Sequence, residues 1–306
     1  MADLMMEKKK TCIIVCGPTA VGKTGIALEL AKAFNTKIIS ADSRQCYKEL
    51  NIGVAKPSEQ ELASVPHFFI NSHSIFDEIN VADFVRYADS AIAEIFSSHD
   101  VAIMVGGTGL YIDAFCNGLD NIPEVDPEIR ITIRQNFLKL GIAWLQAEVK
   151  QTDPEYAAND DLSNPQRMMR ALEVIISTGK SIKAFQTAPG REHDFAIVRI
   201  ALELPRDLLY ERINDRVDQM IKAGLIEEVQ GLLQFEKLNA LNTVGYKELF
   251  AFLQGQLSLE TSIGLIKQNS RRYAKRQLTW FKRDHKTRWF FPDQWKEIKD
   301  YCYKTN

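Results

Sequence analysis

Short apolar runs alternate with longer segments in which apolar residues recur every three or four positions. A continuous apolar run at residues 12–16, a short segment at residues 37–40 that contains Ile38 and Ile39, and a second continuous apolar run at residues 101–105 predict strands. Helical spacing follows the first continuous run at residues 25–34 and precedes the second at residues 81–96. Strands that are apolar on both faces and alternate with helices are typical of a parallel sheet covered on both sides. We therefore predict an α/β fold with a parallel sheet and helices on both faces.

This pattern changes near residue 117. A turning linker with two prolines occupies residues 121–127, and the segment that follows carries only helical patterns until a strand pattern returns at residues 196–202. A further helical pattern runs over residues 206–223. The sequence thus predicts an α/β core, residues 1–116 and 193–306, that is interrupted by a helical insertion subdomain at residues 117–192.

A glycine-rich segment lies between the first predicted strand and the first predicted helix. It consists of Gly17, Pro18, Thr19, Ala20, Val21, Gly22, Lys23 and Thr24, and it matches the phosphate-loop pattern G-x-x-x-x-G-K-[ST]. In that pattern, backbone N–H groups, the helix N-terminus and the lysine surround a phosphate, and the hydroxyl is placed for Mg²⁺. The strand–loop–helix context favours a diphosphate or triphosphate site, and a P-loop NTPase-like core, over an incidental glycine-rich turn.

The strand ends distinguish among the proteins that use such a loop. NTPases carry a Mg²⁺-holding carboxylate after a second strand, whereas the run at residues 101–105 is followed by Gly106, Gly107 and Thr108. The nearest strand-end carboxylate is Asp42, which a doubly wound sheet would place across the cleft from the phosphate loop. Asp42 either caps a turn or acts as a catalytic base. The pattern disfavours a motor or switch protein.

Composition narrows the class of protein further. The chain has 306 residues, of which 45% are hydrophobic, and no apolar run is long enough to span a membrane. Its five cysteines are odd in number and form no C-x-x-C pair, which predicts neither a disulfide framework nor a zinc ribbon. We expect a cytoplasmic monomer without a membrane partner.

The charge is unevenly distributed along the chain. The net charge is −2, yet residues 267–288 hold nine lysines and arginines and a single acidic residue. On a helix, Arg272, Lys275, Arg276 and Arg283 would lie near one face because their spacings are three, four and seven residues. This face is either merely solvated or binds a nucleic-acid backbone.

Beyond the phosphate loop, a series of motifs resembles, in order and spacing, the tRNA dimethylallyltransferases of the bacterial type. The motifs are ADSRQCYK at residues 41–48, NIGVAKP at 51–57, GGTGLY at 106–111, NPQRMMRALE at 164–173, GYKEL at 245–249 and KRQLTWF at 275–281. The similarity runs from about residue 11 to residue 290. Three positions depart from the family's pattern: Asn51 stands in place of an aspartate, Val54 in place of a threonine and Cys46 in place of an apolar residue.

The resemblance implies a reaction. Such an enzyme transfers a dimethylallyl group from dimethylallyl diphosphate to the exocyclic amino nitrogen of the adenosine 3′ to the anticodon of a tRNA, and it releases pyrophosphate. No phosphoryl group moves, so the phosphate loop cradles a leaving group.

The resemblance also implies roles for individual residues. Residues 17–24 would bind the diphosphate together with Arg216, Thr24 would be a ligand of a Mg²⁺ cofactor, and Asp42 would accept the proton of the amine, with Lys23, Thr24 and Thr108 as further catalytic residues. Arg212 and Arg216 lie one turn apart on a predicted helix. Their side chains either bind the pyrophosphate or form ion pairs on the surface. The residues expected to contact the tRNA anticodon stem-loop are Asp42, Ser43, Arg44, Gln45, Thr108, Arg130, Gln166, Arg167, Met168, Met169, Arg170, Arg272 and Arg276.

Three other functions share the phosphate loop. An enzyme that prenylates free AMP or ADP would use the same cradle and base but would need neither the basic segment nor so large an insertion. In a small-molecule kinase, Asp42 would face a hydroxyl group. An RNA-binding ATPase is disfavoured by the missing strand-end carboxylate.

Overall fold

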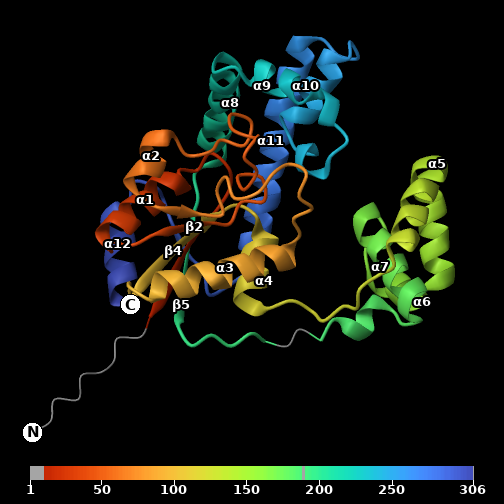
Figure 1. Ribbon diagram of the computed structural model, residues 1–306, viewed down its shortest axis with the longest axis horizontal. Helices are drawn as coiled ribbons and strands as arrows, with labels where there is room; N and C mark the ends of the chain where they lie inside the picture. The colour runs from red at the N-terminus through yellow and green to blue at the C-terminus, as the bar shows by residue number, and fades with distance from the viewer. Residues whose placement is uncertain (1–9, 188–189, 306) are drawn as a thin grey trace, which may run out of the picture. The chain divides into compact units, whose positions relative to one another are not determined.

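A six-stranded parallel sheet forms the centre of the computed structural model, which describes residues 10–187 and 190–305 (Figure 1). The strand order is β3-β2-β4-β1-β5-β6, and every pairing is parallel. The strands are β1 (Thr11–Cys16), β2 (Ile38–Ser40), β3 (His67–Phe68), β4 (Val101–Gly106), β5 (Ala196–Leu202) and β6 (Arg288–Phe290). The α/β fold predicted from the sequence is confirmed.

Strand β1 shows why the sheet must be covered on both sides. All its residues are buried, and alternate side chains enter different hydrophobic clusters: Cys12 and Ile14 one of them, Ile13 and Val15 the other. Because successive side chains of a strand point to opposite faces, the two clusters lie on opposite sides of the sheet. A continuous apolar run is therefore the sequence that this position requires.

Helices of the same unit surround the sheet. They are α1 (Lys23–Ala33), α2 (Glu59–Ser64), α3 (Val81–Phe96), α4 (Gly109–Asn117), α8 (Arg206–Lys222), α9 (Leu225–Gly231), α10 (Tyr246–Leu253), α11 (Leu259–Phe281) and α12 (Trp295–Lys304), with short 3₁₀ helices η2 (Leu233–Phe235) and η3 (Asn239–Leu241). Helix α3 and strand β5 have the bounds that the apolar pattern predicts. Strands β3 and β6 were missed, because each lies at an edge of the sheet and is too short and too exposed to form a buried apolar run.

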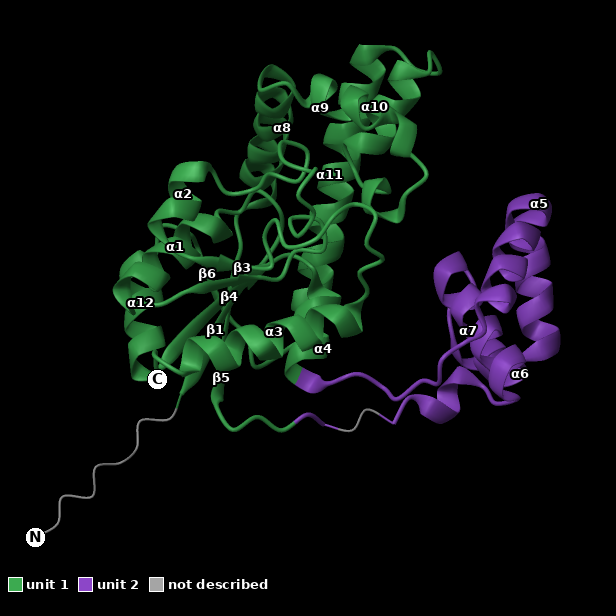
Figure 2. Cartoon of the chain, in the orientation of Figure 1, with its two compact units in different colours: residues 1–116, 192–306 green, residues 117–191 purple. Residues whose placement is uncertain are grey.

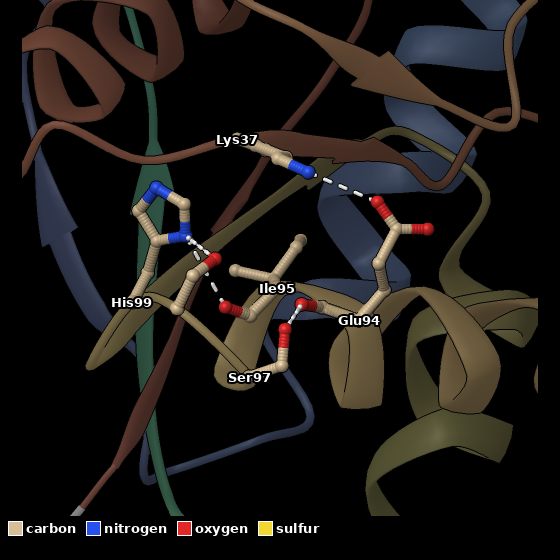
Figure 3. A network of polar contacts seen from close by, with 6 residues as sticks. Lys37, Glu94, Ile95, Ser97 and His99 are labelled. Carbon is tan, nitrogen blue, oxygen red and sulfur yellow. Dashed lines mark hydrogen bonds and ion pairs between the residues drawn. The ribbon is translucent and has the colours of Figure 1, made fainter.

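Polar contacts fix the turn between α3 and β4, at the amino ends of the strands (Figure 3). The Ser97 hydroxyl donates to the carbonyl of Glu94, and the His99 ring contacts the carbonyl of Ile95. Lys37, just before β2, pairs with the Glu94 carboxylate at 2.9 Å. These contacts lie at the amino ends of the strands, whereas Gly106 lies at a carboxyl end. They therefore stabilise the fold around the sheet without lining the candidate site.

Residues 117–191 form a separate compact unit, while residues 1–116 and 192–306 form the unit that contains the sheet (Figure 2). The smaller unit consists of α5 (Pro127–Thr152), α6 (Pro154–Asn159), α7 (Pro165–Thr178) and η1 (Ile182–Phe185). Each of its three α-helices begins at a proline that follows a capping side chain, Asp126, Asp153 or Asn164. Pro127, Pro154 and Pro165 therefore mark helix starts. Leu145, Val149 and Leu172 belong to its own hydrophobic core.

No helix within residues 10–187 or 190–305 is both long and apolar enough to cross a membrane.

Candidate active site

The phosphate loop joins the end of β1 to the start of α1. Gly17 has a φ of +139°, and a Cβ at this position would lie 2.7 Å from the carbonyl oxygen of Leu202, so only glycine fits here. Gly22 is the N-cap of α1 in the left-handed region. The Lys23 ammonium donates to the carbonyl of Pro18 at 2.7 Å, which closes the loop around the N-terminus of the helix.

A cavity of about 790 Å³ opens above this loop and is lined by residues from β2, α8 and α11 as well. The predicted site residues that line it are Thr19, Ala20, Gly22, Lys23, Thr24, Asp42, Ser43, Arg44, Gln45, Arg212, Arg216 and Arg276. The other three residues of the loop, Gly17, Pro18 and Val21, are buried beneath its surface. The structure therefore brings most of the residues predicted for this unit into one cavity.

Two cations lie at the phosphate loop. The Arg216 guanidinium donates to the Thr19 hydroxyl at 3.3 Å, so its partner is the loop. Burial, and then repulsion by Arg216, lower the pKa of Lys23 to about 8, and the charge of Asp42 opposes this change. Burial also lowers the pKa of Arg216, again against the effect of Asp42. The arrangement favours an anionic ligand, because only one carboxylate offsets two cations.

Asp42 does cap a turn, but with only one of its oxygens. Its Oδ1 accepts hydrogen bonds from the backbone N–H groups of Arg44 at 2.9 Å and Gln45 at 3.3 Å. Within the part of the chain that the structure describes, Oδ2 has no hydrogen-bond partner. The two roles expected from the sequence are therefore compatible: one oxygen holds the turn, and the other is available to a ligand.

Thr108 fixes the backbone on both sides of Asp42. The Thr108 N–H donates to the carbonyl of Ala41 at 3.3 Å, and the Ser43 N–H donates to the Thr108 hydroxyl at 3.1 Å. The loop after β4 and the loop after β2 are therefore bonded to each other. Thr108 lies beside the cavity and orients the carboxylate that faces it.

Gln45 supports the next loop. Its amide donates to the carbonyls of Val54 at 3.2 Å and Ala55 at 3.0 Å. The contact uses the backbone of Val54, so it is independent of the threonine-to-valine difference noted in the sequence. Glu228, which sequence reasoning missed, accepts from the N–H groups of Ile52 and Gly53. Nothing in the amphipathic pattern of α9 marks Glu228 as different from an exposed carboxylate.

Helix α11 contributes two uncharged residues that sequence reasoning also missed. Tyr273 lines the cavity, and burial and the charge of Asp42 raise the pKa of its phenol to about 12, while its interaction with Thr108 opposes this change. Gln277 is buried and contacts both the phosphate loop and the loop after β4. The arginines of this helix drew attention in the sequence, while its inward face carries these contacts.

The basic face of α11 is shorter than predicted. Arg272 and Arg276 are exposed on it, and the Arg276 guanidinium lies 5.6 Å from the centre of the Tyr273 ring. The helix ends at Phe281, so Arg283 lies beyond it, contrary to the expectation of a continuous helical face. The acidic residue of the segment, Asp284, pairs with Arg199 of β5.

Within the smaller unit, the predicted RNA-contacting residues divide into two groups. Gln166 and Arg167 are exposed at the start of α7, while Arg130 and Arg170 both contact the Glu173 carboxylate, at 3.4 Å and 3.2 Å. In contrast, Met168 and Met169 lie in the hydrophobic core of the unit, at 0% and 4% exposure. Their side chains are occupied in packing, so the predicted contact with RNA stays a prediction for their backbone alone.

The oxygen atoms near the phosphate loop suit a Mg²⁺ ion that is held mainly by the phosphates of a substrate rather than by the protein. The Thr24 hydroxyl lines the cavity, and Asp42 adds a carboxylate oxygen. Residues 10–187 and 190–305 contain no group of three or more histidine, cysteine or acidic side chains that could hold a metal by themselves. Mg²⁺ commonly keeps waters and binds through one or two protein oxygens plus substrate phosphates, so the residues present fit such an ion.

Comparison with known proteins assigns the family. The IPP transferase family model matches residues 45–284. A relative from Christiangramia forsetii, named tRNA dimethylallyltransferase, is 50% identical over 94% of this chain and 96% of its own length. The chain belongs to the IPP transferase family. A second member of the family, the tRNA dimethylallyltransferase of Cytophaga hutchinsonii, is 47% identical over 94% of this chain and 95% of its own length.

Solved structures of IPP transferase family members share the fold. The tRNA isopentenylpyrophosphate transferase of Bacillus halodurans is 36% identical with a TM-score of 0.72, and the alignment covers 97% of each chain. A eukaryotic dimethylallyltransferase acting on tRNA is 26% identical with a TM-score of 0.72, over 89% of this chain and 69% of that one. The family assignment makes this chain an enzyme, a prenyltransferase.

The lowered pKa of Lys23 predicts how diphosphate binding depends on pH. Below about pH 8 the Lys23 ammonium is charged in the free protein. Above that pH the Lys23 amine is mostly neutral, so it must take up a proton when the diphosphate binds. A terminal phosphate with a pKa of about 6 is already ionised in this range. The Kd for dimethylallyl diphosphate should therefore be nearly constant from pH 7 to 8 and rise by up to about tenfold per pH unit above that, as measured by calorimetry.

Lys23→Arg is the matched control for this measurement. Its guanidinium stays protonated, so the rise in Kd above pH 8 should disappear. An unchanged Kd between pH 7 and 9.5 in the native protein would show that Lys23 does not titrate against the bound diphosphate.

Proposed function

We propose that this protein transfers the dimethylallyl group of dimethylallyl diphosphate to the exocyclic amino nitrogen of the adenosine 3′ to the anticodon of a tRNA. The bond between the allylic carbon and the diphosphate oxygen breaks, and its electron pair leaves with pyrophosphate. The amino nitrogen forms a bond to the same carbon and loses a proton. The family assignment supports the class of reaction, and the cavity supports the roles of the residues.

One observation carries this proposal: a phosphate loop with two cations lines the same cavity as Asp42, whose Oδ2 has no hydrogen-bond partner among the residues that the structure describes. Lys23, Arg216 and the backbone of the loop stabilise the negative charge that develops on the departing pyrophosphate. Donors that are already in position stabilise such charge without reorganising. The absence of a carboxylate at the end of β4 fits this use, because no phosphoryl group is transferred.

Asp42 acts on the incoming amine. A carboxylate is too weak a base to deprotonate a neutral aromatic amine before attack, so Asp42 accepts a hydrogen bond from the amino group and orients it. As the nitrogen–carbon bond forms, positive charge builds on the nitrogen, and the proton passes to Oδ2. Thr108 holds the backbone on either side of Asp42 in place for this step.

Mg²⁺ is the cofactor we propose, with the Thr24 hydroxyl as its protein ligand. When bound, the ion neutralises charge on the diphosphate and improves it as a leaving group.

Polar and basic side chains in each unit bind the tRNA. Arg272 and Arg276 of α11 are exposed on the unit that contains the cavity. On the helical insertion, Gln166 and Arg167 are exposed, and Arg130 and Arg170 are partly exposed beside Glu173. A base inside a stacked anticodon loop is out of reach of a cavity, so the adenosine must be flipped out of the stack. We place the reaction in the cytoplasm, where tRNA is found.

Labelled dimethylallyl diphosphate tests the proposal directly. With unmodified tRNA, the label should appear on the adenosine 3′ to the anticodon, and one pyrophosphate should be released per label. With AMP or ADP in place of tRNA, no labelled product should form, because neither nucleotide engages the exposed cations. Product on AMP alone would support the free-nucleotide enzyme, and transfer of phosphate from ATP would support a kinase.

Replacement of Asp42 by asparagine separates its two roles. The amide oxygen can still accept from the N–H groups of Arg44 and Gln45, so the turn should persist, but the proton acceptor is lost. We expect turnover to fall by roughly 10²- to 10⁴-fold, with little change in the Kd for dimethylallyl diphosphate. The control is Asp100→Asn, at an exposed position before β4. Full turnover in Asp42→Asn would remove Asp42 from the chemistry.

Replacement of Arg272 and Arg276 by alanine tests the RNA-binding face. Each phosphate contact contributes to the salt dependence of binding, so the slope of log K against log salt should become shallower by about one to two units. The control replaces Lys296 and Lys304, two exposed lysines on α12, by alanine. Equal slopes in the double variant and the native protein would assign the arginines to a merely solvated face.

A further inference from the structure

Gln277 joins the two loops that the proposed reaction needs. Its Oε1 accepts a hydrogen bond from the N–H of Thr19 in the phosphate loop, at 2.9 Å. Its Nε2 donates to the carbonyl of Gly107, in the loop after β4, also at 2.9 Å. The side chain is 6% exposed, so water does not compete freely for either contact. A single amide thus spans from the diphosphate site to the residue next to Thr108.

The neighbouring loop is shaped to admit helix α11. A Cβ on Gly107 would lie 2.2 Å from the Gln277 amide nitrogen, and a Cβ on Gly109 would lie 2.4 Å from the Trp280 ring. Both distances are too short for real atoms, so a side chain at either position would displace Gln277 or Trp280 from its place on this helix. The GGTG segment at residues 106–109 therefore forms the turn after β4 and also provides the surface against which α11 packs.

The chemistry of the two contacts selects an amide. The Thr19 N–H needs an acceptor, and the Gly107 carbonyl needs a donor, so the orientation of the Gln277 amide is determined. A carboxylate could serve only the first group and a methionine neither. Tyr273, one turn earlier on the same helix, contacts Thr108. Helix α11 therefore contacts the two loops at three residues, Thr19, Gly107 and Thr108.

We propose that Gln277 is a positioning residue that sets the separation between the diphosphate site and the Asp42–Thr108 pair. This inference rests on the proposed function, because it concerns the geometry of attack in that reaction. The leaving group is held by the loop of Thr19, whereas the amine is oriented by residues bonded to the loop of Gly107. The tether stabilises the arrangement in which the amine faces the allylic carbon, and reaction rates are steeply sensitive to such placement.

The variant Gln277→Met keeps the length and buried volume of the side chain but removes both hydrogen bonds. At saturating tRNA and dimethylallyl diphosphate, its single-turnover rate should fall by about 10- to 100-fold. Its Kd for dimethylallyl diphosphate should change by less than about threefold, because the cations and the other N–H groups of the loop remain. The matched control is Gln268→Met, at an exposed position of the same helix, which should behave like the native protein.

The variant Gln277→Glu adds a readout that a purely structural role would not change. The ionised carboxylate can accept from Thr19 but repels the Gly107 carbonyl, whereas the protonated carboxyl can both accept and donate. The rate of this variant relative to the native protein should therefore rise by about tenfold or more as the pH falls from 8 to 5.5. The corresponding ratio for Gln277→Met should not change with pH.

Three results would overturn the inference while native activity is intact. They are a native single-turnover rate in Gln277→Met, a parallel loss of rate, diphosphate affinity and thermal midpoint in that variant, and a Gln277→Glu rate ratio that is independent of pH. Failure of the native protein to prenylate tRNA would instead contradict the proposed function, and the two failures are therefore distinguishable.

Discussion

The active-site cavity depends on positive charge that is held out of water with little compensation from the protein. Lys23 and Arg216 both lie at the phosphate loop, and each is less easily protonated than it would be in water. Asp42 is the carboxylate whose charge opposes both shifts. A polyanionic ligand would supply the missing negative charge, so the repulsion between these two cations favours binding of a polyanion.

The parallel register places the chemistry around these cations. Cys16 pairs with Gly106, and Ser40 pairs with Val105, so three strands end side by side. The chain leaves these ends as the phosphate loop, the Asp42 turn and the loop of Thr108. Their proximity follows from the parallel sheet, in which neighbouring strands deliver their carboxyl ends to one edge. The hydrogen bonds of Thr108 and Gln277 then fix the loops relative to one another at atomic scale.

Helix α11 carries exposed arginines and loop-contacting residues on neighbouring faces. Arg272 and Arg276 are exposed, and Arg276 also lines the cavity, while Gln277 is buried and contacts the loops. The close approach that excludes a side chain at Gly107 and Gly109 is the packing consequence. A rigid helix that touches both loops holds them in a fixed relation, which a set of independent loops could not do.

The local chemical patterns of the sequence determine much of this protein. Apolar runs mark the buried strands, such as β1 and β4, because a strand covered on both faces must be apolar throughout. The phosphate loop, Asp42 and the insertion are also local signals, and each is read from a few consecutive residues. Short edge strands such as β3 and β6 carry no such signal, since they bury too little to constrain their composition.

Only the tertiary structure decides which side chains meet. The contacts of Gln277 join residues 258 and 170 positions away in the chain, and no local pattern encodes such a distance. Met168 and Met169 are similar: their motif resembles an RNA-contacting segment, but the packing of the insertion places them in its core. Sequence thus determines the elements and the reactive groups, whereas long-range packing determines the orientation of those groups, because orientation depends on neighbours that only folding brings together.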